Sequence, residues 1–358
     1  MQIQEELKSF KNRIDPLIQG YFDSALKDMR AEDDLVSEAL GHAQAIMLAG
    51  GKRLRSAFMY YGYLGAGGTD AERALHASMS IEFIHSFLLV HDDIIDRDEI
   101  RHGVPTLHKR YADFGKRFFP DKDVEHFGNS IALIIGDMLY SFGNDIIFQS
   151  GFPKEQIFQA LSRLQKVVSF TVIGQARDVY MEYKREASEE EILNMYRNKT
   201  AKYTVEGPLH IGALLAGATP ELLDKLSAYA LPLGIAFQIQ DDILGIFGSA
   251  DRIGKPVGSD IQEGKLTLLT ARALKNGDRK ERARIKEILA RGTALTEAEC
   301  QEFCRLIEET GSLREVQALA QTYIEEGKQA LLNLRPLLAT PTYDFLEGVA
   351  EYMTKREY

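Results

Sequence analysis

The sequence predicts an all-α protein, and three kinds of observation lead to this fold class. Helix-start signals recur along the chain, apolar residues recur at intervals of three and four, and strand-like alternation between turn dipeptides is scarce. Capping boxes, in which a hydroxyl and a carboxylate satisfy each other's backbone amides, are expected at Thr69–Glu72, Ser188–Glu191, Thr296–Glu299 and Ser312–Glu315. Thr219-Pro220 and Thr340-Pro341 add two starts with proline at the first helical position.

The connections between these helices follow from the remaining pattern. Pro208 and Pro232 fall inside otherwise helical stretches, so we expect each to kink its helix and free backbone groups there. The longest irregular segments are expected at 114–125 and 247–264, and the second is Gly-rich and charged, which is typical of a functional lid. No linker rich in Pro, Gly or Ser divides the chain, and the length of 358 residues does not decide between one large domain and two.

Composition limits the class of function. Lysine and arginine number 43 against 53 acidic residues, and the net charge of −10 disfavours a nucleic-acid-binding protein. The two cysteines, Cys300 and Cys304, exclude a disulfide framework and suit a reducing compartment. The N-terminal segment lacks the apolar core of a signal peptide, and no apolar run approaches the ~18 residues of a membrane span. We therefore expect a soluble cytoplasmic protein.

Three aspartates end a long apolar helix pattern over residues 81–98, IEFIHSFLLVHDDIIDRD. Asp92 and Asp96 lie one turn apart on one face, with Asp93 beside them. Like charges at this spacing repel, and a divalent cation such as Mg²⁺ reverses the effect because carboxylate oxygens are its preferred ligands. The alternative is a solvated acidic face, the commonest fate of charge runs. The buried character of the preceding apolar residues favours the metal site.

A second acidic pair follows the same plan. Asp241 and Asp242 end an apolar stretch in residues 237–245, FQIQDDILG, where Gln238 and Gln240 offer further oxygen atoms. Two carboxylate clusters, each at the polar end of an apolar helix, suggest an arrangement that holds metal ions on a diphosphate from both sides.

Basic residues accompany both motifs. The segment GGKRLRS places Gly51 before Lys52 and Arg55, which lie three apart on one helix face, as a phosphate site requires. The alternative is that these cations only solvate a helix. The other basic residues beside the acidic motifs are Arg101, His102, Lys199, Lys255 and Lys265.

Five segments in order, GGKRLRS, HDDIIDRDEIRHGVPT, GQARD, KTA and FQIQDDILGIFG…GKPVGSDIQEGK, strongly resemble the trans-isoprenyl diphosphate synthases of the polyprenyl synthetase family. The match extends from about Leu48 to Leu269. It implies a single-domain helical bundle around a deep central cavity, the isoprenoid synthase type I fold, usually as a homodimer. It also implies the head-to-tail condensation of isopentenyl diphosphate with dimethylallyl, geranyl or farnesyl diphosphate, with three Mg²⁺ ions, which Mn²⁺ is expected to replace.

The resemblance also assigns roles to residues. Asp92 and Asp96, supported by Asp93, would bind two metal ions, and Asp241, with Asp242 beside it, would bind a third. The residues implied to hold the allylic diphosphate are Arg101, Lys199, Lys255 and Lys265. Those implied to hold isopentenyl diphosphate are Gly51, Lys52, Arg55 and His85, while Thr200 and Gln238 would line the reacting region.

Two positions depart from the family pattern. The family usually has Arg-Arg-Gly after the first motif, whereas this chain has Arg101-His102-Gly103, so the grip of His102 on isopentenyl diphosphate is expected to be weaker or pH-sensitive. The second motif ends in Gly245 where many members have aspartate. The sequence leaves open whether Asp251 or Asp260 compensates.

Product length is expected to depend on Phe87 and Leu88, which precede the first motif on the side where the tail should grow. In the family, an aromatic residue at the earlier position only, with no insertion between Asp93 and Asp96, is typical of geranylgeranyl diphosphate synthases. We therefore predict a C20 product, with a C15 or longer product as the alternative. The competing interpretation of Phe87 is an ordinary core residue.

Three rival functions are less consistent with the sequence. A class I terpene cyclase and a head-to-head condensing enzyme would not need Lys52 and Arg55, because those enzymes lack this second diphosphate site. A non-catalytic partner subunit would be expected to lose metal carboxylates, and both motifs retain their leading aspartate pairs.

Overall fold

The protein is almost entirely helical over residues 3–248 and 259–354, which this computed structural model describes. Within those residues the only strands are β1 (Ile100–Arg101) and β2 (Val104–Pro105), which pair in an antiparallel hairpin. The predicted all-α class is therefore confirmed. By its internal contacts the chain divides into unit 1, residues 1–161 and 211–217, and unit 2, residues 162–210 and 218–358. That the whole chain acts as one catalytic domain stays a prediction.

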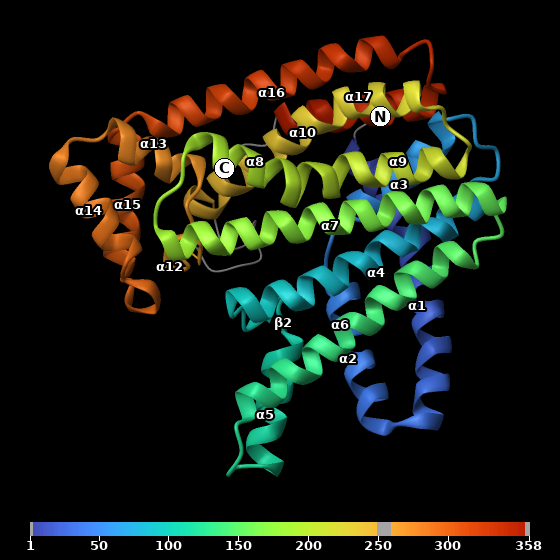
Figure 1. Ribbon diagram of the computed structural model, residues 1–358, viewed down its shortest axis with the longest axis horizontal. Coiled ribbons are helices and arrows are strands. Elements are labelled where there is room, and N and C mark those ends of the chain that lie inside the picture. Colours follow the sequence, from blue (N-terminus) through green and yellow to red (C-terminus); the bar gives the residue numbers. More distant parts are fainter. Residues whose placement is uncertain (1–2, 249–258, 355–358) are drawn as a thin grey trace. The chain divides into compact units, whose positions relative to one another are not determined.

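Unit 1 is built around one long helix, α4 (Ala71–Asp96), which packs along α6 (Val124–Phe148) and against α1 and α3 (Figure 1). Fully buried apolar side chains of α1, α3 and α4, such as Phe22, Phe58 and Phe83, form its core. The other helices of this unit are α1 (Ile3–Glu32), α2 (Asp34–Ala49), α3 (Leu54–Gly65) and α5 (Leu107–Phe118), followed by the first residues of α7 (Lys154–Lys184).

Two expectations for unit 1 were wrong in detail. The segment 114–125 is mostly helical, because α5 continues to Phe118 and the Asp123 side chain caps α6 by accepting the His126 N–H. The cap of α4 is Asp70, whose side chain accepts the Arg73 N–H, so the box predicted at residue 69 does not form. In both places an aspartate accepts the exposed amides of the first turn.

Unit 2 has α10 (Pro220–Phe247) as its central helix, packed against α16 (Ser312–Leu334) and the segment η1 (Arg197–Glu206) (Figure 1). Buried apolar side chains of these and the neighbouring helices form one core cluster. The remaining elements are α8 (Glu189–Tyr196), α12 (Ser259–Gln262), α13 (Leu268–Asn276), α14 (Arg279–Leu289), η2 (Gly292–Ala294), α15 (Glu297–Glu309) and α17 (Thr340–Thr354). The helix α9 (Gly207–Leu215) begins in unit 2 and continues into residues 211–217 of unit 1.

The helix starts of unit 2 largely follow the sequence. Capping boxes form at Ser188 and Thr296 as predicted, and the Thr219 side chain caps α10 with proline at the first position. The box predicted at Ser312 is wrong, since Gly311 is the cap residue and Ser312 already lies in α16. Asp278 forms a further box with the third residue of α14, where a carboxylate replaces the hydroxyl of the usual pattern.

The two prolines have different effects. Before Pro208, residues Arg197–Glu206 form a π-helix, and the Gly207 N–H donates to the carbonyl five residues earlier, at Lys202. Wide turns of this kind are rare and often lie at functional sites. Pro232, by contrast, lies inside α10, whose helical span continues on both sides of it.

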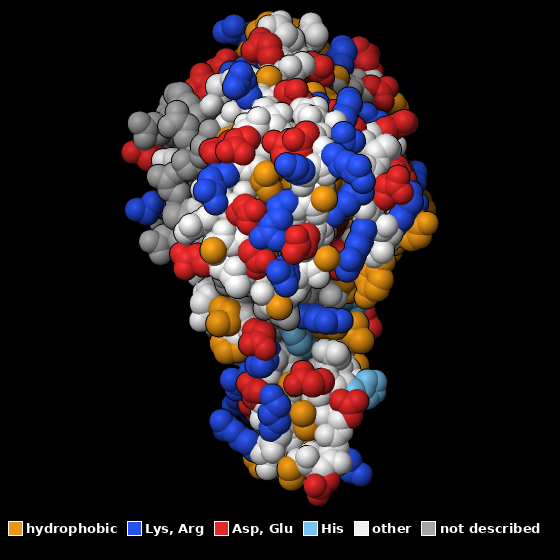
Figure 2. Space-filling view, turned by 90° about the vertical axis from the view of Figure 1, so that its left-hand side faces the viewer, with side chains coloured by type: hydrophobic (Ala, Val, Ile, Leu, Met, Phe, Trp, Pro, Cys, Tyr) orange, Lys and Arg blue, Asp and Glu red, His pale blue; other side chains and the backbone are white. Residues whose placement is uncertain are grey.

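Two helices, α6 and α10, are long and apolar enough to cross a membrane by length and composition alone. This is weak support for a span, because core helices pass the same test, and 61% of the most apolar part of α10 is buried. Acidic and basic side chains are interspersed on the face seen in Figure 2.

Candidate active site

The first acidic motif lies at the C-terminal end of α4. Asp92 and Asp96 are partly exposed, and the last turn of the helix contains no basic residue. Carboxylates at the negative end of a helix dipole are unfavourable unless a cation lies nearby. Arg97 ends the helix and the charge of Arg101 acts on Asp92, and a divalent cation would add to this neutralisation.

Asp93 has a different environment from its neighbours. It is 2% exposed, and the Arg101 guanidinium bridges it to Asp98, with Arg101 Nε donating to Asp93 Oδ1 over 2.6 Å. Arg97 ends α4 in the left-handed conformation, so the chain reverses and β1 brings Arg101 back to the helix. Burial raises the pKa of the Asp93 carboxyl to about 6, although the charge of Arg101 opposes this shift. Asp93 therefore orients Arg101, and metal binding by Asp92 and Asp96 stays a prediction.

The predicted residues of the second basic cluster also come together. Arg55, at the start of α3, places Nη1 3.1 Å from Nε2 of His85 on α4. A guanidinium can only donate, so Nε2 accepts and His85 is neutral. Burial, followed by the charge of Arg55, holds the pKa of His85 well below its usual range. Lys52 lies before α3, which begins only at Leu54, so the expectation that Lys52 and Arg55 share one helix face was wrong. The left-handed conformation of Arg53 separates Lys52 from the helix.

His102 lies against the glycine pair of the basic cluster. It adopts a left-handed conformation, with φ 52°, in the hairpin between β1 and β2. A Cβ added to Gly50 would lie 2.4 Å from the His102 ring, so only glycine permits this approach. Burial, followed by the charge of Arg101, lowers the pKa of His102. His102 is therefore neutral at pH 7 and carries no charge where the family usually has arginine.

We expect His102→Arg to lower the KM for isopentenyl diphosphate, because it adds a permanent charge beside the glycine pair that precedes Lys52. A hydrogen bond to a charged group contributes about 1.5–3 kcal/mol, so the KM should fall about tenfold or more at pH 8. The advantage should shrink as the pH falls, because wild-type His102 takes up a proton only below its lowered pKa. The measurement is the KM for isopentenyl diphosphate of the wild type divided by that of His102→Arg, at several pH values between 5.5 and 8. A ratio of one throughout would mean that residue 102 does not contact this substrate.

In unit 2 the second acidic motif belongs to a continuous hydrogen-bond chain. Thr200 Oγ1 donates to Gln238 Oε1 over 2.5 Å, and Gln238 Nε2 donates to Asp242 Oδ1 over 2.7 Å. Asp242 also accepts the Tyr196 hydroxyl, which in turn accepts the Leu268 N–H at the start of α13. Burial raises the pKa of Tyr196 well above its usual range, so its hydroxyl keeps the proton that it donates.

This chain gives the two aspartates of the second motif different roles, as in the first. Asp242 is 4% exposed and accepts two hydrogen bonds from its neighbours, whereas Asp241 is partly exposed. The structure thus joins Thr200, Gln238 and Asp242 by hydrogen bonds, and the metal-binding roles of Asp241 and Asp242 stay predictions.

Lys199 lies on the π-helix, directly before Thr200. Its Nζ is 2.7 Å from Asp178 Oδ2 of α7, and both side chains are largely buried. The backbone around Lys199 is packed on two sides by glycines: a Cβ at Gly174 would lie 2.4 Å from Lys199 N, and one at Gly234 would lie 2.4 Å from Ala201 Cα. Close packing of α7 and α10 against η1 therefore fixes the direction of Lys199.

Divalent metal ions fit these residues, although within the described parts of the chain no three His, Cys, Asp or Glu side chains form a complete cluster. Mg²⁺ usually keeps several waters and binds one or two carboxylates together with substrate phosphates. Asp92 and Asp96 form such an incomplete set in unit 1, and Asp241 does so in unit 2. A diphosphate is the ligand that would complete either set.

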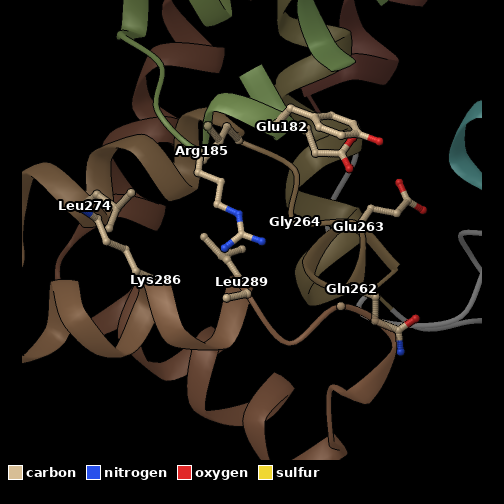
Figure 3. Close-up of a pocket in the computed structure, with 12 residues that line it drawn as sticks. Glu182, Arg185, Gln262, Glu263, Gly264, Leu274, Lys286 and Leu289 are labelled. Atoms are coloured by element: carbon tan, nitrogen blue, oxygen red, sulfur yellow. The ribbon is translucent and has the colours of Figure 1, made fainter. Parts of the chain in front are cut away.

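The segment after the second motif is described only in part. Lys265 forms an ion pair with Glu263. Lys255 and Asp251 lie outside the described residues, and the Asp260 side chain is likewise not described. Beside Lys265 lies a pocket of about 510 Å³ into which Arg185 extends (Figure 3). Its lining contains Glu263 but none of the site residues predicted from the sequence.

Phe87 of α4 is partly buried, and its ring contacts α6. Its ring centroid is 4.8 Å from that of His91 and 5.2 Å from that of Tyr140 on α6. One turn further from Asp92, Phe83 is fully buried and packs on Tyr21 and other aromatic rings. Leu88 is also partly buried. Phe87 is thus not a fully enclosed core residue, and Tyr140 completes an aromatic pair at this level.

The sequence analysis missed three residues at these sites, namely Asp178, Tyr196 and Tyr140. Asp178 belongs to the segment GQARD, where an acid four residues after a glycine on a helix was the only available signal. Tyr196 and Tyr140 lie on apolar helix faces and look like core residues until their partners are known.

The comparisons with known proteins decide the family. The polyprenyl synthetase model matches residues 37–307. The chain belongs to the polyprenyl synthetase family. It is 33% identical to a geranylgeranyl diphosphate synthase of Methanosarcina mazei over 100% of this chain and 99% of that protein. It is also 33% identical to a geranylfarnesyl diphosphate synthase of Aeropyrum pernix, over 88% and 93% respectively.

Solved structures agree with this assignment. A geranylgeranyl pyrophosphate synthase from Corynebacterium glutamicum, complexed with isoprenyl diphosphate and magnesium, matches with a TM-score of 0.91 and 31% identity. The match covers 98% of this polyprenyl synthetase and 99% of that chain. The type I isoprenoid synthase fold implied by the sequence is therefore confirmed.

Proposed function

We propose that this polyprenyl synthetase condenses isopentenyl diphosphate with allylic diphosphates and stops at the C20 product, geranylgeranyl diphosphate. The observation that carries the proposal is the contact of Arg55 with neutral His85, beside the ion pair of Arg101 with the first acidic motif. Arg55 and Arg101 thus have different partners, as two anionic substrates would require. The names of the Methanosarcina and Corynebacterium relatives support the C20 product, and the Aeropyrum relative makes C25 the next product to test.

The chain's own residues contribute to each step of the proposed reaction. Lys199 and Arg101 hold the allylic diphosphate and stabilise the charge that develops on it when its C–O bond breaks. Divalent metal ions, when bound at Asp92, Asp96 and Asp241, supply further neutralisation of that charge. Lys52 and Arg55 orient isopentenyl diphosphate so that its double bond attacks the allylic carbon.

The reaction ends when the new cation loses a proton, which the departing diphosphate accepts. Apolar side chains around the reacting carbons exclude water, which would otherwise quench the cation. We further propose that residues 1–358 act as one catalytic domain, and that three ions bind, with Mn²⁺ able to replace Mg²⁺.

We also propose that the enzyme is a soluble, cytoplasmic homodimer. Leu133 and Ile134 on α6 are 44% and 57% exposed, and Val172 and Ile173 on α7 are half-exposed. Neighbouring exposed apolar residues of this kind are typical of a surface that is covered in an assembly. Sedimentation at several concentrations would test this proposal.

The function is tested by incubating the protein with labelled isopentenyl diphosphate, Mg²⁺ and each allylic primer in turn, and then chromatographing the products. We expect a C20 diphosphate from each of the three primers, dimethylallyl, geranyl and farnesyl diphosphate. A cyclic hydrocarbon formed without isopentenyl diphosphate would indicate a terpene cyclase instead. Absence of any product, with or without metal, would indicate a non-catalytic subunit.

The two diphosphate sites should separate kinetically. Lys52→Ala or Arg55→Ala should raise the KM for isopentenyl diphosphate about 10- to 100-fold, because each removes a charged contact. Lys199→Ala should impair the use of the allylic substrate instead. The measurement is the KM for each substrate at saturation of the other. If Arg55→Ala changed only the allylic KM, the assignment of the two sites would be wrong.

A further inference from the structure

The basic cluster begins at a residue with an unusual conformation. Arg53, between Lys52 and Arg55, is the cap residue of α3 and has φ 55°, in the left-handed region that non-glycine residues rarely adopt. Its side chain forms no cap hydrogen bond, and the first turn of α3 contains no acid. Another part of the molecule must therefore satisfy the start of α3.

The Arg53 side chain joins three helices of unit 1. It is 4% exposed, and Nε lies 2.7 Å from Asp15 of α1 while Nη1 lies 3.2 Å from Glu82 of α4. Nη2 donates to the carbonyl of Met47 on α2 over 2.7 Å. A guanidinium directs its donors in a rigid fork, so these three contacts fix the position of Arg53.

Glu82 provides the missing cap. It is 3% exposed, and its Oε1 accepts the Ser56 hydroxyl over 2.5 Å and the Ser56 N–H over 3.3 Å. Ser56 is the third residue of α3, where the cap residue's own side chain normally accepts the N–H. Glu82 therefore caps α3 from a neighbouring helix, one turn before His85.

We propose that Arg53 and Glu82 are positioning residues for isopentenyl diphosphate. Together they fix the start of α3 to α4, so that Lys52 and Arg55 converge with His85 on one diphosphate. Because Glu82 shares α4 with the first acidic motif, the same contacts set the distance between this cluster and the aspartates. The inference rests on the proposed function of the cluster and adds the residues that orient it.

Two substitutions separate positioning from simple charge. Arg53→Lys keeps the positive charge and loses the fork, so a charge effect alone predicts no change. Glu82→Gln removes a negative charge beside the cluster, so a charge effect alone predicts tighter binding of the anion. Positioning predicts the same result for both variants: the KM for isopentenyl diphosphate rises about tenfold, since small misplacements of binding groups cost large factors.

The experiment measures KM for each substrate, kcat and the thermal melting midpoint for both variants. We expect both variants to raise the KM for isopentenyl diphosphate and to keep the KM for the allylic substrate within about twofold of wild type. Calorimetry without the allylic substrate should show that the Kd for isopentenyl diphosphate rises by a similar factor. An unchanged or lowered KM for isopentenyl diphosphate in Arg53→Lys would overturn the proposal. So would equal losses for both substrates, which would indicate a merely structural role. If Glu82→Gln does not fold, the KM for isopentenyl diphosphate of Arg53→Lys alone tests the positioning role.

The matched control is an exposed ion pair of the same unit. Arg110 and Glu38 lie 3.0 Å apart and are 43% and 52% exposed, so Arg110→Lys and Glu38→Gln should leave both KM values within about twofold of wild type.

A wild-type protein that binds isopentenyl diphosphate but transfers no prenyl group would contradict the proposed function while leaving the Kd comparison intact. A wild-type protein that does not bind it would overturn the positioning role.

Discussion

Asp92→Ala is expected to lower turnover by ~10² or more while leaving the helical fold intact. Asp92 is partly exposed at the end of α4, so its removal should cost little stability. It would remove one of the two unit 1 carboxylates that we propose to bind a metal ion. Asp241→Ala should behave similarly in unit 2. Steady-state kinetics with Mg²⁺ titrated from zero would measure both effects.

The matched controls use acids that the structure places elsewhere. Asp224→Ala changes an exposed acid on α10, the helix of Asp241, and should leave turnover unchanged. Asp93→Asn should weaken the ion pair with Arg101. It should therefore impair use of the allylic substrate more than it changes the metal requirement. Chelation should abolish wild-type activity, and Mg²⁺ or Mn²⁺ should restore it. Wild-type turnover in Asp92→Ala would contradict the metal assignment.

Phe87→Ala is expected to lengthen the product beyond C20. The Phe87 ring lies against Tyr140, and both are partly exposed, so the pair is placed to form the floor that stops the growing tail. Without the ring, the next barrier is Phe83, one turn or about 6 Å further along α4. The product should therefore grow by a limited amount and not indefinitely. Chromatography of the dephosphorylated products would measure the distribution.

Variants of α6 test whether Tyr140 belongs to the same floor. Tyr140→Ala should also lengthen the product, whereas Tyr140→Phe keeps the ring and should leave the product unchanged. Phe148→Ala is the control, because Phe148 is 62% exposed at the end of the same helix. An unchanged distribution in both Phe87→Ala and Tyr140→Ala would show that other residues set the length.

Much of this protein could be predicted from sequence because its signals are local. The helices follow from caps and apolar spacing, whose effects act within one or two turns. Asp92 and Asp96 were found for the same reason: residues three or four apart on a helix share a face whatever surrounds it. The family resemblance then supplied the reaction, which no spacing alone could have given.

Only the tertiary structure decided what each member of a pair does. Asp92 and Asp93 are equivalent in sequence, but adjacent helical residues differ by about 100° around the axis, so one faces solvent and the other Arg101. Asp241 and Asp242 divide in the same way, with Tyr196 as the buried partner. The cap of α3 depends on Glu82, 26 residues away, and no local pattern reports such a contact. Burial and long-range partners set these roles, because both depend on how the helices pack.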